Sequence, residues 1–164
     1  MRFVDVRNSL GKTFCDYLLT LDVNYKNAYL TLEVPAEYKP YAERRVRFYL
    51  TFEEAFKEFL PAGDLETVLF LGKVLNNLGF YFESHELVEK YWLNYTGELK
   101  KMLQAVIQVA IANMHLEGGN KRGYQQMKLL AITNLNPYGG FVYGINIEGL
   151  KREIENSEGF IAIV

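Results

Sequence analysis

The sequence has almost no cysteine: Cys15 is the only one among 164 residues. A single thiol cannot form a disulfide within the chain, and it cannot supply the several thiolates of a cysteine-based zinc site. Stability must therefore come from packing. The absence of a disulfide framework fits a reducing compartment.

Long apolar runs are also missing. No segment reaches the roughly 20 apolar residues that a membrane-spanning helix requires. Even the apolar segment 103–116 is interrupted by Gln104, Gln108 and Asn113. Charged residues within Met1–Arg7 stand where a secretion signal needs an apolar core. These features predict a cytoplasmic protein that does not associate with a membrane.

The chain lacks a strongly basic segment. Its 18 Lys and Arg residues are balanced by 20 Asp and Glu residues, which gives a net charge of −2. The densest basic stretch, residues 43–47, begins with the acidic Glu43. A nucleic-acid-binding domain needs a basic face. We therefore expect no nucleic-acid partner.

The first third of the sequence is rich in β-branched and aromatic residues. Two such runs, 18–23 and 28–34, flank the polar turn 24–27, which is typical of a β-hairpin. In residues 46–52 apolar side chains alternate with others, the period of a half-buried strand. Residues 3–7 add a candidate edge strand.

The remainder shows helical periodicity. Asp64 is a suitable N-cap for the second predicted helix, and Gly118 and Gly119 end the fourth. The fourth helix is apolar nearly all round, so it should lie at the centre. The predicted helices cover residues 53–60, 65–78, 80–94, 98–117, 120–135 and 147–156.

The predicted fold class is α+β. It is a C-terminal antiparallel helical bundle with an N-terminal β-hairpin or small antiparallel sheet appended. We expect residues 1–60 to form the β-rich extension, packed on a bundle domain of residues 61–164. A hairpin of about fifty residues rarely folds without such additional packing.

Polar residues in the bundle point to one cluster. His85 and Glu89 are four residues apart on one helix, so their side chains can meet. Gln104 and Gln108 form a polar line on the next helix. The tight link 95–97 makes the two helices antiparallel neighbours, so the four side chains are predicted to converge.

His115 falls outside this cluster. It lies about 10 Å beyond Gln108 along the helix axis. It therefore belongs to a second subsite, together with Asn120, or it caps the helix end. The first cluster also has a structural alternative. A His–Glu–Gln group between helices is often a hydrogen-bond network that fixes their packing.

Known catalytic and metal-binding patterns are absent. The segment from His85 to Glu89 has Glu where a zinc protease needs its second His, and no Glu-x-x-His pair occurs. Glu83 and Glu86 are expected on a solvated face together with Lys90. With His85 and Glu89 as the only two ligands, no metal site is predicted. No catalytic residue and no cofactor is assigned.

Residues 79–92 resemble the signature of the domain of unknown function 309 family. That signature has an aromatic-rich start, Glu-small-His-Glu, two apolar residues, Glu, and a Trp shortly after. Similar supporting segments are Val106–Ala110, His115, Gly119–Gly123 and Gly144–Ile147.

The resemblance covers about residues 65–157. It departs from the family at Val88, where many members have Trp, and at Lys121 and Arg122, which add charge. It implies a compact helical bundle and no established reaction. The N-terminal strands would be an addition to the family.

Two functions remain open. In the first, the cluster binds or converts a small polar ligand, with His85 as acid or base, Glu89 tuning it, and Gln104 and Gln108 orienting the ligand. In the second, the cluster is structural, and the protein is an interaction module that recruits a partner or a second copy of itself. The N-terminal hairpin, with its edge strands and aromatic residues, favours the second.

Overall fold

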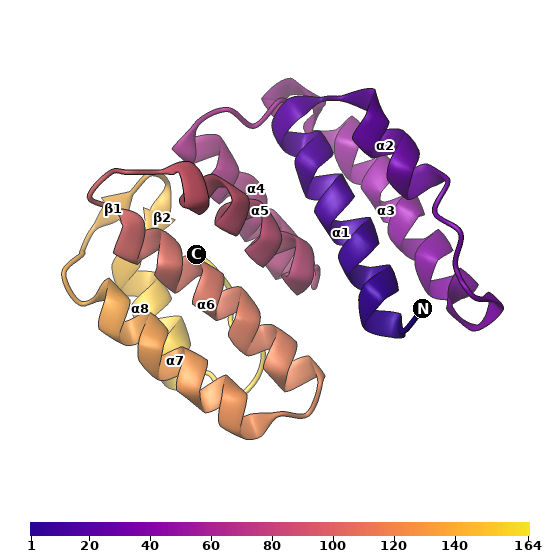
Figure 1. Ribbon diagram of the computed structural model, residues 1–164. Helices are drawn as coiled ribbons and strands as arrows, with labels where there is room; N and C mark the ends of the chain where they lie inside the picture. Colours follow the sequence, from indigo (N-terminus) through magenta and orange to yellow (C-terminus); the bar gives the residue numbers. More distant parts are fainter. The chain divides into compact units, whose positions relative to one another are not determined.

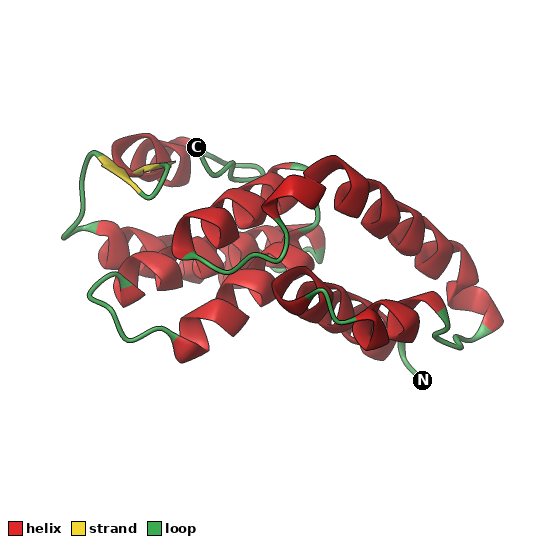
Figure 2. Cartoon of the chain, turned by 90° about the horizontal axis from the view of Figure 1, so that it is seen from above, coloured by secondary structure: helices red, strands yellow, loops and turns green.

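A computed structural model describes all 164 residues. Eight α-helices account for most of the chain, and a single two-stranded antiparallel sheet is the only β-structure. The residues group into two compact units, Met1–Gly63 and Asp64–Val164. Figure 1 labels the elements, and Figure 2 shows how little of the chain is strand.

The N-terminal unit contains three helices. They are α1 (Phe3–Thr20), α2 (Val23–Leu30) and α3 (Lys39–Phe56), and α1 packs against both of the others. Short 3₁₀ turns, η1 (Ala36–Tyr38) and η2 (Lys57–Phe59), precede and follow α3. The Asp22 carboxylate accepts a hydrogen bond from the amide of Asn24 and so caps the start of α2.

The predicted N-terminal β-hairpin is wrong, and so are the predicted strands at residues 3–7 and 46–52. Residues 3–20 form one helix, which buries Val6, Leu10, Phe14 and Leu18 at four-residue spacing. This periodicity begins upstream of residues 18–23, the predicted first strand of the hairpin. The chain is therefore mostly helical, and the α+β assignment with an N-terminal sheet is corrected.

The alternation in residues 46–52 has a helical explanation. Successive residues on a helix turn by about 100°, so apolar side chains at every second position fall on two faces. Phe48 and Phe52 pack in the aromatic core, whereas Val46 and Leu50 line a surface pocket. When two faces of a helix both carry apolar residues, the sequence can therefore show the same alternation as a strand.

Aromatic side chains form the core of this unit. The rings of Phe14 and Tyr49 stack with their centroids 3.9 Å apart, and Tyr29 and Phe52 contact Phe14 edge-on. All four residues are buried. Each such ring removes a large area from water, which allows a unit of only 63 residues to have its own core.

The C-terminal unit is a bundle in which α4 to α7 each pack against the next helix in the chain, and α8 packs against α7. Strands β1 and β2 pair between α7 and α8, with Phe141 opposite Asn146 and Val142 opposite Ile145. The elements are α4 (Leu65–Asn77), α5 (Tyr81–Asn94), α6 (Lys100–Glu117), α7 (Lys121–Leu135), β1 (Phe141–Val142), β2 (Ile145–Asn146) and α8 (Ile147–Asn156).

Sequence reasoning places these helices to within a few residues. The Asp64 carboxylate accepts a hydrogen bond from the Thr67 amide at 2.8 Å, so the predicted cap of α4 is confirmed. Helix α6 packs against both α5 and α7 and is buried along most of its length, which confirms its central position.

None of the helices combines the length and the apolar character that crossing a membrane requires. The cytoplasmic location and the packing of the N-terminal residues on the bundle stay predictions.

A hydrogen bond that joins α1 to α3 in the N-terminal unit is open to test. The Tyr17 hydroxyl donates to Glu53 at 2.6 Å, and Lys26 pairs with the same carboxylate at 2.8 Å. Burial and then the bond to Glu53 raise the pKa of the Tyr17 hydroxyl from 10 to about 12. The folded state holds the Tyr17 proton more tightly than the unfolded state does. Its contribution to the free energy of unfolding is therefore complete below pH 10 and is lost as the pH rises towards 12.

We expect Tyr17→Phe to lower the free energy of unfolding by roughly 1.5 kcal/mol near neutral pH, because a hydrogen bond to a charged group is removed. The difference from the wild type should shrink at about pH 11, where Tyr17 of the wild type begins to ionise. Urea unfolding at both pH values measures this. Tyr25→Phe is the matched control, and a Tyr17→Phe difference independent of pH contradicts the expectation.

Candidate functional site

Helix α5 carries the residues of the predicted cluster, and its rotation is fixed by a close approach to α4. The Ser84 hydroxyl donates to the carbonyl oxygen of Gly72 at 2.7 Å. A Cβ atom at Gly72 would lie 2.8 Å from a methyl carbon of Val88, so a larger residue at this position would have to displace Val88. With Ser84 and Val88 against α4, His85 and Glu89 are held on the neighbouring face.

The two ring nitrogens of His85 have different surroundings. Nδ1 lies 2.7 Å from the carbonyl oxygen of Phe82. A carbonyl oxygen can only accept, so Nδ1 carries a hydrogen in this arrangement. Nε2 faces two carboxylates: it lies 3.4 Å from Oε2 of Glu89 and 3.8 Å from Oε2 of Glu86. We call His85, Glu86 and Glu89 the α5 triad.

The α5 triad is partly shielded from water. The side chains of His85 and Glu86 are 13% and 10% exposed, whereas that of Glu89 is 43% exposed. The second oxygen of Glu86 lies 3.5 Å from Nζ of Lys90. One ligand atom from each member of the triad lies within 4.8 Å of the others. The triad is therefore a small acidic group with one open side.

This arrangement has room for a positive charge between the three side chains. If His85 is neutral with its hydrogen on Nδ1, the lone pair of Nε2 points towards two carboxylate oxygens and all three atoms repel one another. A proton on Nε2 or a bound cation between the three atoms removes this repulsion. The geometry can thus hold a shared proton or a metal ion.

Glu83 and Glu86 are not on a solvated face, and that prediction is wrong. Both residues are buried, Glu83 completely. Sequence reasoning consequently missed Glu86 as a third partner of His85. The signal was present, because residues 85, 86 and 89 fall within an arc of about 100° on a helical wheel.

Gln104 and Gln108 make no hydrogen bond to His85 or Glu89. Oε1 of the buried Gln108 accepts instead from Nδ2 of Asn134, at 2.9 Å, and so ties α6 to α7. Gln104 is half-buried on α6. The contacts therefore join His85 to Glu89 and, separately, Gln108 to α7, and the convergence of all four residues stays a prediction.

His115 and Asn120 do meet. Oδ1 of Asn120 accepts from the amide of Gly123, which caps the start of α7 and fixes the orientation of the side-chain amide. Its Nδ2 consequently donates to Nδ1 of His115 at 3.2 Å. The pair forms the turn between α6 and α7, and its role as a ligand subsite stays a prediction.

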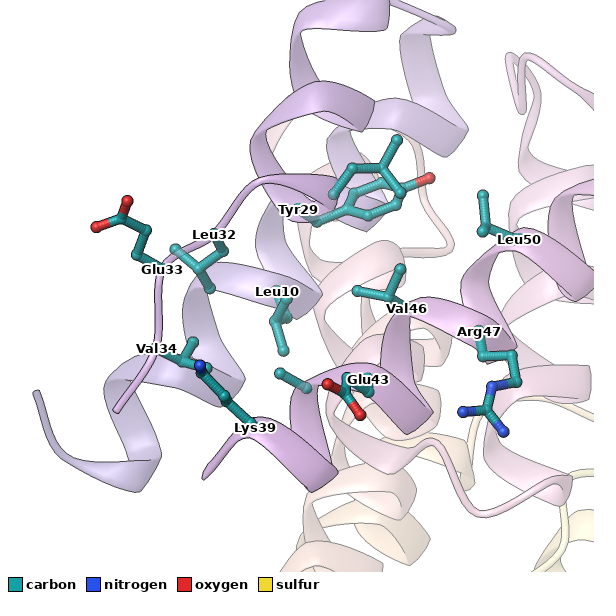
Figure 3. A pocket seen from close by; sticks show the side chains of 12 residues that line it. Leu10, Tyr29, Leu32, Glu33, Val34, Lys39, Glu43, Val46, Arg47 and Leu50 are labelled. Atoms are coloured by element: carbon teal, nitrogen blue, oxygen red, sulfur yellow. The ribbon is translucent and has the colours of Figure 1, made fainter. Parts of the chain in front are cut away.

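The N-terminal unit has a surface pocket of about 740 Å³, which sequence reasoning did not find because it predicted strands there. In Figure 3 the side chains of Leu10, Leu32 and Val46 turn towards one another across it. Charged side chains from α3 and the preceding loop stand among the lining residues: Glu33, Lys39, Glu43 and Arg47.

Comparison with known protein families finds a match to one family model over part of the chain. Residues 70–127 match the family model of the Domain of unknown function (DUF309). The matched range contains the α5 triad and His115, and it runs from within α4 to within α7. This confirms the resemblance over residues 70–127, and the helical structure agrees with it. The resemblance beyond residue 127 stays a prediction.

The N-terminal unit lies outside the matched range. Nothing among the curated proteins matches this chain. Nothing among the solved structures matches it either. The site must therefore be interpreted from its own chemistry.

The turn between α6 and α7 supplies a test of how tightly His115 is held. A Cβ atom at Gly123 would lie 2.6 Å from Nδ1 of His115 and 2.8 Å from Nδ2 of Asn120. We expect Gly123→Ala to break the His115–Asn120 pair and to cost about 1–3 kcal/mol of unfolding free energy through overpacking.

Chemical denaturation measures this cost, and the matched control is Gly118→Ala in the same turn. A Cβ atom there would meet nothing closer than 3.5 Å, so we expect little change. Equal stability of the two variants would contradict the tight packing of His115.

Proposed function

We propose that the C-terminal unit binds a divalent metal ion at the α5 triad. The observation that supports this best is that an imidazole nitrogen and two carboxylate oxygens lie within 4.8 Å of one another. Hydrogen bonding of the opposite ring nitrogen to a backbone carbonyl is the arrangement that orients histidine ligands in metal sites. The contact of His85 with Phe82 provides it.

The donor set narrows the choice of ion. One imidazole and two carboxylates suit Mn²⁺, Fe²⁺ or Zn²⁺ better than ions that prefer thiolates. Ligand bonds of about 2.0–2.2 Å require the three atoms to draw together slightly. Glu89 is the most exposed of the three, so its side chain has room to make that movement.

Three protein ligands leave coordination positions open, as in catalytic rather than structural metal sites. A small polar ligand or a water molecule would occupy them on the open side of the triad, next to Glu89. The proposal therefore contains the ligand-binding role predicted from the sequence. It replaces the acid–base role of His85, because Nε2 cannot bind a metal and exchange a proton at once.

We expect the purified protein to bind one Mn²⁺ or Zn²⁺ per chain in isothermal titration calorimetry. Metal that binds only the folded state should also raise the thermal midpoint. His85→Ala and Glu86→Gln each remove a ligand, so binding should weaken by about tenfold or more, at least 1.4 kcal/mol. His115→Ala leaves the triad intact and is the matched control, which should bind as the wild type does.

A purely structural triad gives a different result. If the triad is purely structural, His85→Ala lowers the free energy of unfolding. In that case neither the wild type nor His85→Ala binds Mn²⁺, Fe²⁺ or Zn²⁺. Equal metal affinity in the wild type and in His85→Ala would also sink the proposal, because it would place the ion elsewhere.

We propose a second candidate function, that of an interaction module, on the basis of the pocket in the N-terminal unit. Along its edge Lys39, Glu43 and Arg47 follow one another at four-residue spacing on α3. Apolar lining with a row of alternating charge fits the groove mode of recognition, in which an amphipathic helix lays its apolar face into the pocket. A partner helix that complements this row would carry an acidic, a basic and an acidic residue, also at four-residue spacing.

A second copy of the chain fits this row poorly. In a two-fold symmetric contact centred on Glu43, that carboxylate would face its own copy, and Lys39 would face Arg47. Like charges placed opposite one another disfavour association. The partner we propose for this pocket is therefore a different helix. The predicted edge-strand association is not available, since the N-terminal strands do not exist.

An amphipathic peptide with a Leu face and Glu, Lys and Glu at four-residue spacing tests this function. We expect it to bind the wild type in fluorescence anisotropy. The reversed variant Lys39→Glu/Glu43→Lys/Arg47→Glu should bind it about tenfold more weakly or worse, and should prefer a peptide with Lys, Glu and Lys. Arg44→Glu, on an exposed part of the same helix outside the pocket lining, is the control. If the wild type and the reversed variant bind the two peptides with the same affinities, the proposed charge complementarity is contradicted.

A further inference from the structure

The last residues of the chain lie extended without belonging to any sheet. Residues 160–164, drawn in yellow at the C-terminus in Figure 1, form neither helix nor strand. Ile161 and Ile163 are buried, whereas Phe160 is exposed. Alternate burial is the pattern of a strand with one face against a core. We call residues 160–164 the C-terminal segment.

Asparagine side chains take the place of a neighbouring strand. The amide of Ile161 donates to Oδ1 of Asn113 at 2.7 Å, and Nδ2 of Asn113 donates back to the carbonyl oxygen of Ile161 at 2.9 Å. Asn77 forms the same two-bond pair with Ile163, at 2.9 and 2.8 Å. Both polar backbone groups of two alternate residues are thus recognised.

A third asparagine completes the binding surface for the segment. We call this surface, formed by Asn76 and Asn77 of α4 and Asn113 of α6, the groove. Nδ2 of Asn76 donates to the carbonyl oxygen of Ile161 at 3.0 Å, and its Oδ1 accepts from Asn113 at 2.9 Å. Asn76 on α4 and Asn113 on α6 are both buried. An amide that is buried without a hydrogen-bonding partner destabilises the fold, so each of these side chains requires the segment. The groove is therefore built to hold an extended chain.

The contacts define what the groove selects. Main-chain hydrogen bonds give affinity for any extended peptide, and pockets for alternate side chains give specificity. Here the two buried side chains are isoleucines, and the ring of Phe160 stacks on Tyr81 with centroids 5.2 Å apart. None of these contacts depends on the covalent link between the segment and α8.

We propose that the groove between α4 and α6 is a docking site for an extended Ile-x-Ile segment, and that the C-terminal segment of a second copy can occupy it. The covalent link gives the chain's own segment an effective concentration in the millimolar range, so it outcompetes a second copy under ordinary conditions. Docking in trans becomes dominant when the groove of one copy has lost its own segment.

Two full-length variants test this by complementation. Ile161→Asp/Ile163→Asp has an intact groove and a defective segment, because its own segment can no longer bury these positions. Asn77→Ala/Asn113→Ala has an intact segment and a defective groove. We expect each variant alone to stay monomeric in analytical ultracentrifugation and their mixture to form a heterodimer. A chain with all four substitutions is the control and should not pair with either.

A mixture of two folded variants that stays monomeric overturns the proposal. If either variant fails to fold, hydrogen exchange of the wild type decides. Exchange of the Ile161 and Ile163 amides well before those of α6 shows that the segment leaves the groove while the bundle stays folded, and supports docking. Exchange only at the rate of global unfolding overturns it.

Discussion

The close approach of α4 and α5 at Gly72 sets the position of everything that α5 carries. The Ser84 hydroxyl bonds to the Gly72 carbonyl, and Val88 fills the space that a side chain at Gly72 would take. Helix α5 cannot turn about its axis without breaking both contacts. Since the α5 triad lies on the adjacent face, its direction is a consequence of this packing. A site held by core contacts is more precise than one on a loop.

Helix α6 imposes the second constraint, because it is central and yet contains polar residues. Gln108 satisfies its amide through Asn134, and Asn113 satisfies its own through Asn76 and the backbone of Ile161. An apolar helix with two buried amides specifies which neighbours it must have. One neighbour is α7, and the other is the extended C-terminal segment. The buried amides of α6 therefore determine which elements can pack against it.

The helices of the C-terminal unit could be predicted from the sequence because caps and periodicity agree there, as at Asp64 and over residues 147–156. The N-terminal unit could not, since β-branched and aromatic residues favour strands locally and only tertiary packing makes α1 and α3 helical. Within the site, spacing found His85 and Glu89 but not Glu86. The helical wheel places residue 86 within about 100° of His85, but which part of that arc faces inward depends on how the neighbouring helices pack.

The surroundings of His85 bear on whether the triad has a purely structural role. A packing network is satisfied when each acceptor meets a donor. Here Nε2 of His85 faces oxygens of Glu86 and Glu89, and Lys90 contacts the other oxygen of Glu86. Replacing such a group by apolar residues of similar volume is often neutral or stabilising, so packing alone gives no reason to retain it. A proton on Nε2 or a cation held between the three atoms would each remove the repulsion, and the proposed metal ion would also offset the negative charge of the two carboxylates.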